Sequence, residues 1–100
     1  MKSITLNEHE FRIKKLNAIE VLAMRNIIDF ENFHKCVSTF DTILEKFEVK
    51  VKDKFMPVKD GNNYYPAGIE DDLDSIQTLI SFFINDYMRP LFQSSSESKK

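Results

Sequence analysis

The strongest constraint on the fold is a run of apolar residues at helical spacing between Glu31 and Glu48. At about 100° per residue these side chains fall within an arc of roughly 120°, and the positions between them are mostly polar. The pattern predicts an amphipathic helix whose buried stripe consists of Phe33, Cys36, Val37, Phe40, Ile43, Leu44 and Phe47. Burial of that stripe contributes on the order of 10 to 20 kcal/mol, before chain entropy is subtracted.

A preceding helix is predicted from the capping residue Asn17, with Glu20 as its capping-box partner, to about Phe30. This helix is apolar on two sides, so we expect it either to lie between layers or to offer one face to another chain. One arc holds Leu16, Ile19, Leu22, Ala23, Ile27 and Phe30, and a second, nearly opposite face holds Val21, Met24 and Ile28.

A third helix is predicted from Glu70 to Tyr87, because acidic residues open it and suit the positive end of the helix dipole. We expect it to break near Arg89-Pro90. Its core arc contains Leu73, Ile76, Leu79, Ile80, Phe83, Ile84 and Tyr87, and Phe82 lies well outside that arc.

Short apolar runs outside the helices predict strands. Ile4–Leu6 and Phe11–Ile13 form a plausible β-hairpin, and Val49–Val58 alternates as an edge strand, with a return strand starting at Tyr64. The expected fold class is therefore mainly α (α+β), a three-helix domain with an N-terminal β-hairpin and a possible second small hairpin.

Composition limits the organisation of the chain. Its 100 residues carry 14 basic and 16 acidic side chains and one cysteine, which favours a single domain without internal disulfides. No apolar run is long enough for a transmembrane helix or a signal peptide, so we expect a cytosolic protein. We assign residues 1–93 to one helical domain and residues 94–100 to a disordered polar tail.

Residues that carry chemistry are scarce. A metal site would need His9, His34 and Cys36, and the last two point about 200° apart on the predicted helix. No nucleophile, phosphate-binding loop or catalytic motif is found, so we expect no enzyme activity, no metal and no cofactor. A lysine row near Tyr64 and Tyr65 is better explained as a solvated edge strand than as a nucleic-acid site, namely Lys50, Lys52, Lys54 and Lys59.

Surplus apolar residues favour a binding protein instead. They exceed what one buried stripe per helix needs, and they predict a surface for partner binding or weak self-association. The candidate residues are Val21, Met24, Ile28, Phe82, Met88, Leu91 and Phe92.

The opening block resembles the start of tail assembly chaperones of tailed bacteriophages and prophages. The matching residues are Thr5, Leu6 and Asn7, then Phe11 and Ile13, then Lys15, Leu16, Ala18 and Leu22. The resemblance implies a non-enzymatic assembly factor that keeps the tape measure protein soluble until tail tube protein polymerises around it. It also implies a location in the host cell cytoplasm and absence from the mature virion. The alternative from the residues is a small phage or bacterial regulatory protein that binds and inhibits a single globular partner.

Overall fold

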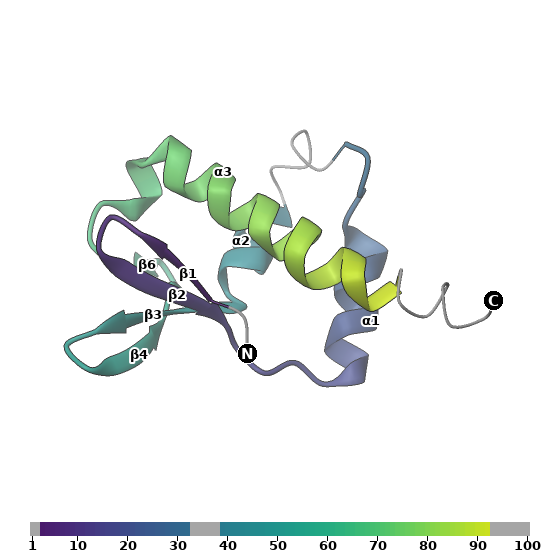
Figure 1. The fold of residues 1–100 in the computed structure, drawn as a ribbon, viewed down its shortest axis with the longest axis horizontal. Helices are drawn as coiled ribbons and strands as arrows, with labels where there is room; N and C mark the ends of the chain where they lie inside the picture. The colour runs from purple at the N-terminus through teal and green to yellow at the C-terminus, as the bar shows by residue number, and fades with distance from the viewer. Residues whose placement is uncertain (1–2, 33–38, 93–100) are drawn as a thin grey trace.

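The computed structural model describes residues 3–32 and 39–92, and the fold is elongated, with extents of 45 × 29 × 22 Å (Figure 1). Residues 93–100, which include the predicted tail, lie outside the described ranges. The elements in chain order are β1 (Ser3–Leu6), β2 (His9–Ile13), α1 (Ala18–Ile27), α2 (Phe40–Leu44), β3 (Phe47–Val51), β4 (Lys54–Pro57), β5 (Lys59–Asp60), β6 (Asn63–Tyr64), the 3-10 helix η3 (Ile69–Asp71), α3 (Leu73–Ser81) and the π-helix η4 (Phe82–Met88).

The main sheet has four antiparallel strands in the order β1-β2-β3-β4, and β5 and β6 form a separate two-stranded sheet. The prediction of a mainly α, three-helix domain is therefore wrong, and the fold is α+β. The N-terminal hairpin is confirmed, with Leu6 opposite His9 and Ile4 opposite Phe11. The single strand expected over 49–58 is instead a hairpin, because the chain turns at Lys52 and Asp53.

The predicted helix over 31–48 is only five residues long in the described part, and Phe47 begins β3 instead of ending that helix. The position of Phe47 fits both a helix and a strand. It lies four residues after Ile43 and three after Leu44, as on one side of a helix, and two residues before Val49, as on one face of a strand. Pairing with β2 decides the outcome, because Ile13 lies directly opposite Phe47. Phe33, Cys36, Val37 and also His34 lie outside the described residues.

One face of the sheet forms the core. Phe11, Ile13, Phe47 and Val49 are buried on it, and α2, α3 and η4 supply the other side. The Phe47 ring lies 6.3 Å from that of Phe82 and 6.0 Å from that of Phe83, measured between centroids. The opposite sheet face is polar, and Arg12 there pairs with Glu48 at 2.9 Å. This arrangement is typical of an antiparallel sheet with one solvated face.

The long C-terminal helix begins at its cap, Asp72, whose side chain accepts a hydrogen bond from the Ser75 backbone N–H. It widens into the π-helix η4 and remains helical to Phe92, so the break expected near Arg89-Pro90 does not occur. Phe82, Phe83 and Ile84 are all buried in succession. The wider turn of a π-helix brings consecutive side chains closer to one face than an α-helix does.

Both hairpins of the main sheet turn through residues with positive φ that are not glycine. Asn7 and Glu8 have φ of 52° and 69°, and Lys52 and Asp53 have φ of 51° and 68°. Two-residue hairpin loops of type I′ require this conformation, and Asn-Gly is the favoured sequence for it.

We therefore expect Glu8→Gly to stabilise the protein by about 0.5 to 1 kcal/mol, since it removes the crowding of a Cβ at positive φ. Thermal unfolding followed by circular dichroism measures the effect. Glu8→Ala is the control, because it removes the same carboxylate and keeps the Cβ. An equal gain in both variants would show that charge, and not backbone conformation, limits stability at this turn.

Candidate functional site

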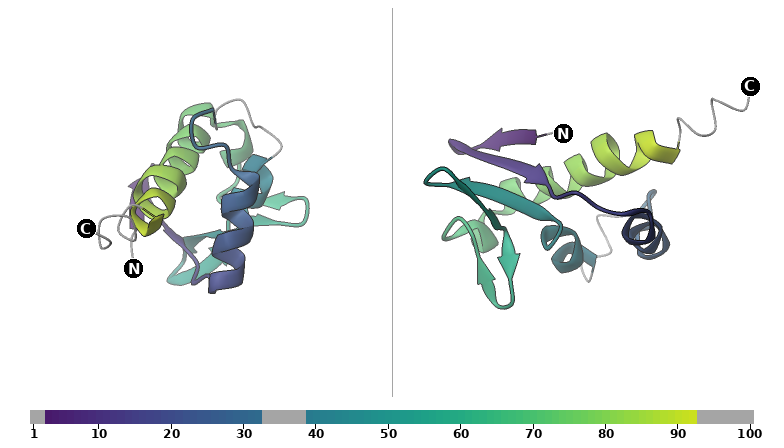
Figure 2. Two further views of the ribbon diagram at one scale, coloured as in Figure 1. Left: turned by 90° about the vertical axis from the view of Figure 1, so that its right-hand side faces the viewer. Right: turned by 90° about the horizontal axis from the view of Figure 1, so that it is seen from below.

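Helix α1 carries the candidate site, and its start is set by local sequence. The Asn17 side chain accepts a hydrogen bond from the Glu20 backbone N–H at 2.8 Å, and Glu20 Oε1 accepts one from the Asn17 backbone N–H at 3.2 Å. This is the predicted capping box. The helix lies beyond the end of the sheet, beside the C-terminal end of the long helix (Figures 1 and 2).

The contacts of α1 show which of its faces is turned inward. Met24 is 2% exposed and Ile28 is 7% exposed, so the prediction that this face lies on the surface is wrong. On the same side, Glu20 lies 3.9 Å from Lys46, and the Arg25 guanidinium lies 4.6 Å from the Phe92 ring centroid. These contacts hold α1 with its second face toward the body of the protein.

The opposite face of α1 is open to solvent. Ile19 is 79% exposed, Leu22 is 53% exposed and Ile27 is 43% exposed. At steps of about 100° per residue these three side chains and the exposed Ala23 and Asn26 fall within an arc of about 140°, so they share one side of the helix. We call Ile19, Leu22, Ala23, Asn26 and Ile27 the α1 apolar face. It holds no ionisable group, so it can bind apolar surface and cannot supply acid-base or nucleophilic chemistry.

The remaining residues that were predicted to lie on the surface differ in how far they are exposed. Phe82 and Met88 are buried, and their assignment to the surface is also wrong. Phe82 lies seven residues after the buried Ser75 and therefore on the same side of the helix, where the Phe47 ring covers it. Val21 and Phe92 are partly buried against the core, and Leu91 is exposed. The structure thus does not bring the predicted residues together on one surface.

A second feature is a pocket of about 170 Å³ where the β1–β2 turn meets the start of α3. Asn7 Nδ2 donates to Asp72 Oδ2 at 3.0 Å and contacts Ser75 Oγ at 3.2 Å, and Ser75 Oγ donates to Asp72 Oδ2 at 2.8 Å. The hydrogen bonds from Ser75 lower the pKa of the Asp72 carboxyl, so it is a carboxylate at neutral pH. His9 also lines this hairpin-tip pocket.

The lysines considered for nucleic acid point in different directions. Lys50 lies on the solvated sheet face opposite Phe55, whereas Lys59 Nζ donates to the Gly61 carbonyl at 2.7 Å and lies 3.8 Å from Glu45. The Tyr64 hydroxyl donates a hydrogen bond to Asp41 Oδ1 at 3.1 Å. Desolvation of that hydroxyl is the main cause that raises its pKa, and the hydrogen bond to Asp41 is the second. Lys50 and Lys59 therefore do not line one strand face with Tyr64.

Comparison with known proteins adds no relative: no protein-family model, curated protein or solved structure matches the chain. Over residues 3–32 and 39–92, no cluster of three histidine, cysteine or acidic side chains could hold a metal ion. Every helix in that part of the chain is too short or too polar to span a membrane.

Proposed function

We propose that the protein is a non-enzymatic binding protein that holds an apolar helical segment of a client on the α1 apolar face. The observation that carries the proposal is the exposure of Ile19, Leu22 and Ile27 on one side of a capped helix. Large apolar side chains grouped on a surface are a mark of interaction sites. The small Ala23 between them leaves room for a client helix to approach closely.

The client we propose is the tape measure protein of a tailed phage, so that the protein is a tail assembly chaperone. The resemblance of the opening block supports this choice, and the α1 apolar face begins within that block. The proposal places the protein in the host cell cytoplasm and outside the mature virion, with tail tube protein as the partner that displaces it. Weak homo-oligomers, formed through the same face, would compete with the client.

The small area of the α1 apolar face suits a chaperone that has to release its client. Burying the exposed parts of three aliphatic side chains yields on the order of 3 to 5 kcal/mol, and most of that is offset by the cost of association. A single copy therefore binds weakly. Many copies along one extended client hold it in solution, and each copy can be displaced separately as the tail tube grows.

The test is co-expression of the chain with the tape measure protein from the same phage genome. We expect the tape measure protein to remain in the soluble fraction and to co-purify with several copies of the chain. Leu22→Asp should abolish both effects, because it places a carboxylate in the α1 apolar face. The matched control is Leu73→Asp, since Leu73 is 69% exposed on α3 and lies outside that face.

Two outcomes contradict the proposal. If Leu22→Asp protects the tape measure protein as well as the unchanged chain does, the α1 apolar face is not the binding surface. If the tape measure protein is not retained and the chain instead forms a one-to-one complex with a globular protein, the regulatory alternative is correct.

A further inference from the structure

The outer edge of β1 is free in the described part of the chain, because β1 pairs only with β2. Leu6 and His9 flank the two-residue turn and form its hydrogen-bonded closing pair. Hydrogen-bonded pairs alternate along an antiparallel ladder, so the N–H and C=O groups of Ile4 and Leu6 face β2. The N–H and C=O groups of Ser3 and Thr5 then point away from the sheet, and both residues are exposed. An edge of this kind is a template for another strand.

The other edge of the sheet is protected. Val58 N–H donates to the Phe47 carbonyl, so Phe55 and Pro57 of β4 are the residues whose backbone groups face outward. Pro57 has no N–H to offer, and Lys54 adds a charge to the same strand. Proline and lysine are the usual means of blocking an edge. In contrast, Ser3–Leu6 contains neither of them.

The hairpin-tip pocket lies at the end of this free edge. Leu6 ends β1 and lines the pocket with His9 and Phe11, which share its sheet face, and the exposed Asn7 and Gly68 form part of its rim. A volume of about 170 Å³ is small for a drug-sized ligand, whose pockets run from about 300 Å³, but it can hold one side chain. Residues opposite each other in paired strands share a face. The residue of an added strand that lies opposite Leu6 would therefore point to this pocket.

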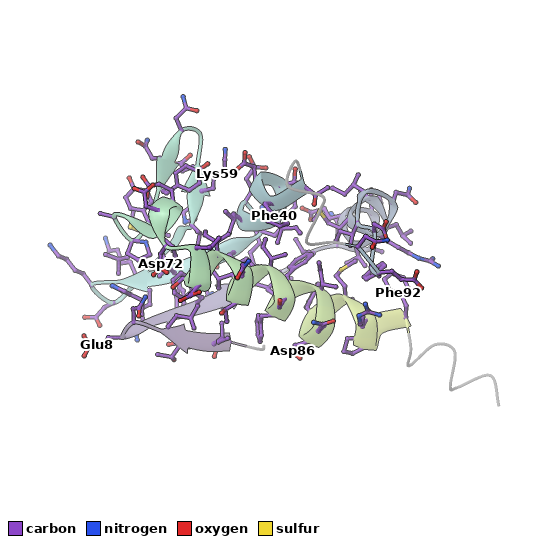
Figure 3. All side chains as sticks on the ribbon, turned by 90° about the horizontal axis from the view of Figure 1, so that it is seen from above. Glu8, Phe40, Lys59, Asp72, Asp86 and Phe92 are labelled. Atoms are coloured by element: carbon purple, nitrogen blue, oxygen red, sulfur yellow. The ribbon has the colours of Figure 1, made fainter. Side chains whose placement is uncertain are left out.

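The charge around the pocket selects the side chain. Asp72 lines it, and Figure 3 shows Asp72 and Glu8 at the same end of the molecule, away from Phe92. Segments 3–11 and 66–81 contain every residue that lines the pocket, and they contain no lysine or arginine; Lys52 and Lys54 of the β3–β4 hairpin lie at the other edge of the sheet. The two segments contain the acidic residues Glu8, Glu10, Glu70, Asp71, Asp72 and Asp74. A basic side chain in the pocket complements these carboxylates, whereas an acidic one is repelled.

We propose that the free edge of β1 binds an extended, basic segment of a partner protein as an added strand, with one lysine or arginine side chain in the hairpin-tip pocket. Backbone hydrogen bonds to Ser3 and Thr5 supply affinity, and the pocket beside Leu6 supplies specificity. This site is separate from the α1 apolar face and does not depend on the proposed function.

The probe is the synthetic peptide acetyl-Val-Lys-Val-Lys-Val-amide, titrated into the ¹⁵N-labelled protein and followed by NMR. We expect saturable shifts of the amides of Ser3, Thr5 and Asn7 and of residues 69–75, with no shifts on α1. A peptide with glutamate in place of lysine should cause none of these shifts. Neither should a peptide with N-methylated backbone amides, because it lacks the donors that an added strand needs. That peptide leaves the protein unaltered, so its result does not depend on the folding of a variant.

Protein variants separate the edge from the pocket. Asp72→Asn keeps an N-cap side chain and removes the charge, so we expect peptide affinity to fall about tenfold or more. Asp29→Asn, at the far end of α1, is the charge-matched control and should change nothing. Thr5→Pro removes an outward N–H without breaking a bond to β2, and it should abolish the shifts. Leu22→Asp should leave them intact, which distinguishes this site from the α1 apolar face.

Three results would overturn the proposal. If Asp72→Asn and the unchanged protein bind the basic peptide with equal affinity, the pocket does not bind the peptide. Peptide shifts confined to α1 would exclude the β1 edge, and equal binding of the acidic peptide would exclude a basic segment as its occupant. If the peptides cause no shifts and Thr5→Pro instead lowers the sedimentation coefficient at high concentration, the occupant of the edge is a second copy of the chain.

Discussion

Phe47→Ala is expected to destabilise the protein by about 3 to 5 kcal/mol. The ring has no exposed surface and contacts the rings of Phe82 and Phe83, so its removal leaves a cavity between the sheet and the long helix. Small domains unfold with a free energy of about 5 to 15 kcal/mol. The variant should therefore lose a large part of its stability, measured as a lower urea midpoint with an unchanged m-value.

The control is Phe55→Ala, on the solvated face of the same sheet. Phe55 contributes chiefly a contact with the Arg12 guanidinium, 3.5 Å from its ring centroid. Such a contact is worth roughly 0.5 to 1 kcal/mol at an exposed site, so the loss should stay below about 1.5 kcal/mol. Equal losses at Phe47 and Phe55 would mean that the two faces of the sheet are not one buried and one solvated.

Features that depend on neighbours in sequence are predictable from the residues. The N-terminal hairpin follows from two short alternating runs, and the capping box follows from the spacing of Asn17 and Glu20. In both cases the deciding hydrogen bonds join residues a few positions apart. Local chemistry also sets the start of α3, but its cap is Asp72, so the helix begins three residues after the predicted start at Glu70.

Features that depend on distant contacts are not predictable in this way. Phe47 fits a helix and a strand equally well by spacing, and pairing with β2 decides between them. The alternation of residues 49–58 continues through Lys52 and Asp53 without a glycine, so the pattern predicts one strand where the structure has two. Phe82 is buried because the Phe47 ring of β3 packs against it, and the periodicity of a single helix does not predict that contact.

The orientation of α1 is the difference that most affects function. Both of its faces are apolar, and the residues that contact its inner side, among them Lys46 and Phe92, are far away in the chain. One signal in the sequence does favour the observed orientation. Asn26 lies in the middle of the arc that contains Ile19 and Leu22, whereas the Met24 face has no polar residue at its centre. A polar residue inside an apolar stripe favours exposure of that side of the helix to solvent.

Aspartate substitutions at two residues on opposite sides of α1, Leu22 and Met24, test this orientation. Met24→Asp should prevent stable folding, because Met24 is 2% exposed and an unpaired carboxylate there adds desolvation to the lost packing. The combined cost is on the order of 5 kcal/mol or more, comparable with the whole stability of a small domain. The expected observation is loss of a cooperative unfolding transition, measured by circular dichroism against urea.

Leu22→Asp should instead leave the free energy of unfolding within about 1 kcal/mol of the unchanged protein, since half of that side chain already contacts water. Both variants introduce the same carboxylate into the same helix, so helix propensity and net charge cancel in the comparison. The difference between them measures only which side of α1 packs on the protein. If Met24→Asp folds and Leu22→Asp does not, α1 packs through Ile19 and Leu22, and the binding surface consists of Val21, Met24 and Ile28 instead.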